Sequence, residues 1–146
     1  MRRAVCAAAA VALAGPGCVV VGRSSAEPLP PSPARVEITL VDFRFEVSAE
    51  LTPGRVVVEV ANRGTVNHSL NLIVLPEDFP PLDRQLRGEE RRGVPTLAQV
   101  PTRRPGQASR FALDLRAGRY GLVCFVVDAD GLTHGEQGMN HEFRVR

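Results

Sequence analysis

Residues 118–146 read GRYGLVCFVVDADGLTHGEQGMNHEFRVR, and this stretch decides most of what the sequence says about fold and site. As far as Cys124 every second side chain is apolar, which is typical of a β-strand with one face on a core. A loop containing several glycines follows, and it carries His134 and Met139 before a final alternating segment. The stretch therefore predicts two strands joined by a loop that bears metal-ligating side chains.

The ligand types in this chain form a specific set. Cys124, His134 and Met139 supply a thiolate, an imidazole and a thioether, and His68 supplies a second imidazole from an earlier apolar run. The whole sequence has only three histidines, two methionines and three cysteines. Thiolate and thioether favour Cu(I) whereas imidazole accepts Cu(II), so the set favours copper, and two His with one Cys and a weak axial Met are typical of a blue-copper electron-transfer site.

The segments before residue 118 also alternate with a period of two. Val36, Ile38 and Leu40 alternate with polar residues, and turn signals at 52–54 and 62–64 separate this segment from the next ones. Similar alternation occurs in residues 56–60, 70–74, 111–115 and 143–145. We therefore predict an all-β, Greek-key β-sandwich of seven or eight short strands.

Residues 76–106 interrupt this pattern. They are rich in Pro, Gly and Arg, and they contain one short helix-compatible piece from Leu82 to Arg92. We predict no strand in this stretch and interpret it as a functional or mobile insertion, because loops of this length are otherwise uncommon.

Two segments resemble the copper-ligand segments of the cupredoxin family. Residues 60–70 read VANRGTVNHSL, and residues 118–125 with His134 and Met139 are similar to the Cys–His–Met loop. In pattern the resemblance covers most of residues 36–146. It implies a sandwich that binds one type 1 copper, with His68, Cys124 and His134 as equatorial ligands and Met139 as axial ligand. It also implies an electron-transfer protein rather than an enzyme.

Two departures from the family pattern stand out. Nine residues separate Cys124 from His134, a long spacer that is similar to that of the copper nitrite reductases. Those enzymes bind a second copper partly through a His adjacent to the Cys, whereas Val123 stands here, so their chemistry does not carry over. Ser69 follows His68 where many members have Asn, so we expect a weaker brace between the His strand and the Cys loop, or one supplied by Asn67.

Other readings of these residues exist. Taken singly, each candidate ligand would ordinarily be a core or loop residue, and only their joint order favours copper. His141 is a rival ligand that we expect to be exposed instead. Residues 128–131 read DADG and suggest a calcium loop, but the later ligands are missing, so we predict a turn.

Residues 1–26 have the pattern of a secretory signal peptide. Arg2 and Arg3 precede an apolar run from residue 4 to residue 22, and small residues follow at 24–26. Because Gly and Pro interrupt the run, a permanent membrane span is disfavoured. The alternative is a lipoprotein signal that ends before Cys18, with a lipid anchor on that residue. Residues 27–35 are Pro-rich and predict a stiff tether.

Export changes the charge balance of the remaining chain. Three of the 18 basic residues and none of the 16 acidic ones lie in residues 1–26, which leaves 15 basic and 16 acidic residues and a formal net charge of −1. A nucleic-acid partner is therefore not expected. The remaining 120 or so residues suit one domain, which we place at 36–146.

The functional hypothesis is an exported, periplasmic or extracellular copper protein that carries single electrons. We expect a redox partner protein, with a membrane-bound protein as one candidate. We expect His134 to be the ligand nearest the surface and the port for electrons. The alternatives are a copper carrier or delivery protein that uses the same four ligands, and a metal-free β-sandwich adaptor in which Cys124 is simply buried.

Overall fold

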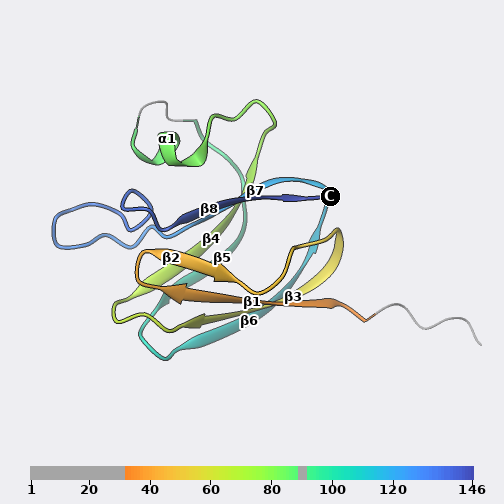
Figure 1. Ribbon diagram of the computed structural model, residues 1–146, viewed down its shortest axis with the longest axis horizontal. Helices are drawn as coiled ribbons and strands as arrows, with labels where there is room; N and C mark the ends of the chain where they lie inside the picture. Colours follow the sequence, from red (N-terminus) through yellow and green to blue (C-terminus); the bar gives the residue numbers. More distant parts are fainter. Residues whose placement is uncertain (1–31, 89–91) are drawn as a thin grey trace, which may run out of the picture. The chain divides into compact units, whose positions relative to one another are not determined.

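The structure, a computed structural model, describes residues 32–88 and 92–146 as a sandwich of two four-stranded sheets (Figure 1). The predictions for the signal peptide, for Cys18 and for residues 27–31 of the tether lie outside the described residues. In chain order the elements are β1 (Ala34–Val41), β2 (Arg44–Val47), β3 (Gly54–Asn62), β4 (His68–Leu75), α1 (Leu82–Leu86), β5 (Thr96–Arg103), β6 (Ala108–Leu115), β7 (Gly118–Val123) and β8 (Asn140–Val145).

The two sheets have the strand orders β2-β1-β3-β6 and β5-β4-β7-β8. β1 and β3 are parallel, and all other neighbouring strands are antiparallel. The chain passes from one sheet to the other after β3, after β5 and after β6, so many strands that are consecutive in sequence lie in different sheets. The predicted all-β sandwich is confirmed, with eight strands in the described part of the chain.

The alternating apolar residues meet between the two sheets. Val36, Ile38 and Leu40 of β1 are each at most 3% exposed, and Leu70 and Leu122 from the opposite sheet are fully buried in the same cluster. Cys124 and Met139 belong to this cluster as well. Two of the four candidate ligands are therefore part of the main hydrophobic core.

The prediction that residues 76–106 contain no strand is wrong, because Thr96–Arg103 forms β5 at the edge of a sheet. Only Val100 is buried in β5, and Pro101 interrupts the run of backbone donors, so the strand has neither a clear apolar alternation nor a typical composition. The predicted helical piece is confirmed in its first part: α1 begins at Leu82 and is five residues long, so it ends before the predicted Arg92. In the part of the chain that the structure describes, no helix is long and apolar enough to cross a membrane.

The segment that contains α1 covers the outer face of the second sheet. Phe79 and Leu82 pack against Ile73 of β4 and Val123 of β7 in a second, smaller apolar cluster. Figure 1 shows α1 above β8, on the outer side of this sheet. Nearly every residue of β4 is buried for this reason, because the strand has the main core on one face and this cluster on the other.

Arg119 anchors the start of this covering segment to the sheet. It lies in β7 and is 9% exposed. Its Nη1 donates hydrogen bonds at 2.9–3.0 Å to the backbone carbonyl oxygens of Pro76, Glu77 and Phe79. Its Nη2 donates at 2.5 Å to Oε1 of Glu142 in β8. The guanidinium thus provides a hydrogen-bond donor to three carbonyl groups in the segment after β4, where the chain has left the sheet and has no neighbouring strand.

Candidate metal centre

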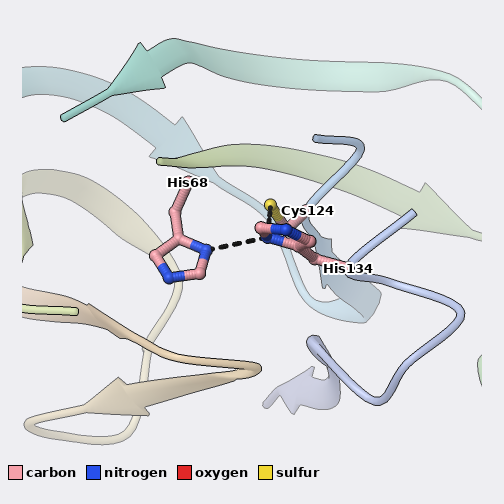
Figure 2. A group of neighbouring side chains, drawn as sticks. All are labelled: His68, Cys124 and His134. Carbon is pink, nitrogen blue, oxygen red and sulfur yellow. Dashed lines mark hydrogen bonds between the residues drawn. The ribbon is translucent and has the colours of Figure 1, made fainter. Parts of the chain in front are cut away.

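The candidate ligands gather at one end of the sandwich. His68 is the first residue of β4, Cys124 follows directly after β7, and His134 lies on the loop that leads to β8. Their donor atoms all lie within 4.8 Å of one another, and all three residues are buried. Figure 2 shows both imidazole rings and the sulfur atom turned toward a common point. The structure therefore brings together three side chains that are up to 66 residues apart in sequence.

The spacing of the donor atoms suits a single metal ion. His68 Nδ1 lies 3.0 Å from His134 Nδ1, and Cys124 Sγ lies 3.6 Å from the same nitrogen. Bonds of the lengths that zinc forms, about 2.0 Å to nitrogen and about 2.3 Å to thiolate, would place neighbouring donors roughly 3.5–4 Å apart in a trigonal arrangement. One ion would therefore fit with a small outward movement of the two rings. The donor set of two imidazoles and one thiolate is that of a trigonal copper site.

Met139 is fully buried next to these ligands, and its backbone joins two of them. The amide of Cys124 donates to the carbonyl oxygen of Met139 at 3.2 Å, and the amide of Met139 donates to the carbonyl oxygen of His134 at 2.8 Å. These bonds hold the three residues in one fixed loop. The backbone of Met139 is therefore fixed in the same loop as Cys124 and His134.

The long spacer between Cys124 and His134 forms a small hairpin-like loop whose two ends lie close together. An isolated bridge joins Val127 to Thr133, and the Asp128 carboxylate caps the turn between them by accepting from backbone amides. The predicted turn at residues 128–131 is confirmed. Because the bridge joins the two ends of this loop, Cys124 and His134 remain neighbours despite the length of the spacer.

Ser69 links the His strand to the Cys loop. Its backbone amide donates to Cys124 Sγ at 3.3 Å, and its hydroxyl accepts from the amide of Phe125 at 3.3 Å. Ser69 itself therefore provides the brace that the sequence analysis expected to be weaker or to come from Asn67. A hydrogen bond to the sulfur also lowers the charge density of a thiolate, which is one way a protein tunes such a site.

The second nitrogen of His68 contacts a residue that the sequence analysis missed. Asp42, in the turn between β1 and β2, places Oδ1 3.0 Å from His68 Nε2. Hydrogen bonds from Thr65 and then from His68 hold the pKa of Asp42 well below its usual range. An ionised carboxylate only accepts hydrogen bonds, so this contact favours the tautomer of His68 with the proton on Nε2, which leaves the Nδ1 lone pair for a metal.

His134 is the most exposed of the four predicted ligands, although it is only 4% exposed. Burial, followed by the proximity of His68, lowers the pKa of His134. The neutral imidazole is the form that binds a metal. The ring of Phe43 lies edge-on to the His134 ring, with 5.0 Å between the centroids. The expectation that His134 lies nearest the surface agrees with this exposure.

His141 lies apart from the group of buried ligands. It is exposed on β8 and stacks on Phe143 with 6.1 Å between the ring centroids. This agrees with the prediction that His141 is an exposed neighbour of the loop, and it leaves His68, Cys124 and His134 as the three converging donors.

The strand order of the two sheets, with a histidine opening β4 and a Cys–His–Met loop between β7 and β8, is that of the cupredoxin fold. The fold that the two sequence segments implied is therefore confirmed.

Among solved structures the chain is similar to auracyanin from the photosynthetic bacterium Roseiflexus castenholzii, with 18% identity, a TM-score of 0.54, and coverage of 80% of this chain and 99% of that one. Auracyanin A, a blue copper protein from Chloroflexus aurantiacus, matches with 18% identity, a TM-score of 0.54 and coverage of 79% and 100%. Rusticyanin from Thiobacillus ferrooxidans matches with 20% identity, a TM-score of 0.56 and coverage of 80% and 79%. No protein-family model and no curated protein matches the sequence.

Proposed function

We propose that the protein is a single-electron carrier that holds one type 1 copper ion, and that it is not an enzyme. The observation that carries this proposal is the convergence of buried donor atoms from His68, Cys124 and His134. We assign Met139 as the weak axial ligand. The similar auracyanin and rusticyanin structures include reduced forms, which supports a redox role for a copper site on this fold.

A copper ion bound here would supply the chemistry by accepting and releasing one electron. The residues of the chain would keep the site unchanged between the two states. His68 is fixed by Asp42, Cys124 by Ser69, and the loop from His134 to Met139 by its own backbone hydrogen bonds. A rigid, buried site reorganises little on electron transfer, which favours fast exchange with a partner.

The surface around His134 suits contact with a redox partner protein. Five exposed apolar residues belong to the turns and loops at this end of the sandwich, which lies on the left in Figure 1. They are Phe43, Val66, Phe125, Val127 and Leu132. Exposed apolar patches often mark interaction sites, so we propose that a partner docks here and exchanges electrons through His134. A lipid anchor on Cys18 would hold the protein at the membrane, and in that case a membrane-bound partner would be within reach.

A copper titration followed by redox cycling tests the proposal. Adding Cu(II) to the apoprotein should produce an intense blue absorption from the thiolate, a reductant should remove the colour, and an oxidant should restore it. A metal-free adaptor would give no colour. A copper delivery protein would lose its copper to a stoichiometric chelator within the time of the redox cycle, whereas an electron carrier should retain it.

Met139→Gln should retain copper and lower the reduction potential. The amide oxygen is a harder donor than a thioether and therefore favours Cu(II) over Cu(I), while the three equatorial ligands still hold the metal. Protein-film voltammetry of the variant and the wild type measures the difference. Complete loss of copper binding would contradict an axial role, and an unchanged potential would point to another fourth neighbour.

We further propose that the protein is exported to the periplasm or the extracellular space. The basic start, apolar run and small-residue exit of residues 1–26 support this location. Mass spectrometry of the protein purified from its native membrane and soluble fractions should find a mature chain that starts at Glu27, or at a lipid-modified Cys18 in the alternative case. An intact N-terminus in both fractions would contradict export.

A further inference from the structure

We propose that Asp42 is a positioning residue for the copper site, which orients His68 and stabilises the oxidised state of the metal. This inference rests on the proposed copper function. It concerns a carboxylate outside the four ligands, contributed by the opposite sheet of the sandwich.

Hydrogen bonds from residues other than His68 also hold the Asp42 carboxylate in place. Its Oδ1 accepts from the backbone amide of Thr65 at 2.9 Å, and its Oδ2 accepts from the Thr65 hydroxyl at 2.6 Å. The amide of Val66 donates a longer bond of 3.4 Å to Oδ1. These donors tie the β1–β2 turn to the loop between β3 and β4, so the carboxylate oxygen has one fixed position.

Gly64 makes room for this contact. A Cβ atom at residue 64 would lie 2.3 Å from Asp42 Oδ1 and 2.9 Å from His68 Nε2, both shorter than non-bonded atoms tolerate. Any larger residue would therefore push the carboxylate and the imidazole apart. The side chain of Asn62 holds the glycine in turn, because Asn62 Oδ1 accepts from the Gly64 amide at 2.9 Å.

The contact has two consequences for a metal on the other side of the ring. With Nε2–H donating to a carboxylate, His68 is kept in the tautomer that offers Nδ1 to the metal. The negative charge makes the imidazole a stronger electron donor and interacts more favourably with Cu(II) than with Cu(I). Asp42 should therefore lower the reduction potential relative to a site with a neutral hydrogen-bond acceptor.

Asp42→Asn separates the charge from the geometry, because the amide oxygen can still accept from His68 and Thr65. Loss of such an outer partner changes metal affinity by about 10–100-fold. We expect the variant to keep its blue absorption, while the ratio of Cu(II) to Cu(I) affinity falls about tenfold. For a one-electron couple this fall corresponds to a rise of about 59 mV in reduction potential.

Asp114→Asn is the matched control, since it removes one carboxylate from the same sheet. Asp114 pairs with Arg55 near the start of β3, at the opposite end of that strand from Asn62. The control should leave the potential essentially unchanged. The proposal would be overturned if the reduction potential of Asp42→Asn equalled that of the wild type or that of Asp114→Asn. A wild type without blue absorption would instead refute the copper function itself.

Nitrogen NMR of the reduced protein gives a second readout that does not depend on the potential. The wild type should show a hydrogen-bonded His68 Nε2–H that exchanges slowly with solvent, and Asp42→Asn should preserve it. Asp42→Leu should show loss of the hydrogen-bonded Nε2–H signal. If that signal persists unchanged in Asp42→Leu while the variant remains folded, Asp42 does not orient the ring.

Discussion

Cys124→Ser should abolish the intense blue absorption of the copper-loaded protein. The substitution replaces a soft, charged thiolate by a hard, neutral hydroxyl, and the charge-transfer absorption requires the sulfur. Cu(II) affinity should fall as well, because only two imidazoles and a weak thioether remain. Absorption spectra of the wild type and variant at equal copper concentration measure the effect. An intense blue absorption in Cys124→Ser would show that the thiolate is not a ligand.

Ser69→Ala is the control for general disturbance around the sulfur. Ser69 contacts Cys124 Sγ through its backbone amide, which the substitution keeps, and through its hydroxyl, which the substitution removes. We expect this variant to stay blue with a modest change in band position or potential. If both variants lost the blue absorption, the loss in Cys124→Ser would report disturbed packing around residue 124 and not the removal of a thiolate ligand.

Arg119→Ala should lower the free energy of unfolding by about 1–3 kcal/mol, the cost of leaving buried polar groups without their hydrogen-bond partner. The substitution leaves the Glu142 carboxylate without its cation and deprives the carbonyl oxygens of Pro76, Glu77 and Phe79 of a common donor. Denaturant titration of the apoprotein measures the change. The blue absorption should survive under native conditions, because Arg119 lies at the opposite end of β7 from Cys124.

Arg144→Ala is the matched control, since Arg144 pairs with Glu77 on the same side of the sheet. That pair is exposed, with 48% and 67% of the two side chains accessible, and such pairs contribute about 0–1 kcal/mol. Equal losses in the two variants would contradict the view that Arg119 anchors the segment after β4.

The strands that face the core were predictable because their side chains alternate between core and solvent. Val36, Ile38 and Leu40 show this pattern, and all three are buried in the structure. The candidate ligands could be recognised for a different reason: a thiolate, two imidazoles and a thioether are rare in this chain, and their order restricts the chemistry.

β5 and Asp42 could not be predicted, and the reasons differ. β5 is an edge strand with one buried residue, so it lacks the alternation on which strand prediction depends. Asp42 stands in a two-residue turn between β1 and β2, where an acidic residue is ordinary. Its role arises from a contact with His68, 26 residues away, that only the packing of the two sheets creates.

X-ray absorption at the copper edge of the loaded protein tests the central claim most directly, because it reports the atoms bound to the metal. We predict two nitrogen atoms and one sulfur atom in the first shell, from His68, His134 and Cys124, with the sulfur at the short distance of a bound thiolate. A shell of nitrogen and oxygen atoms without a short bond to sulfur would contradict the proposed site.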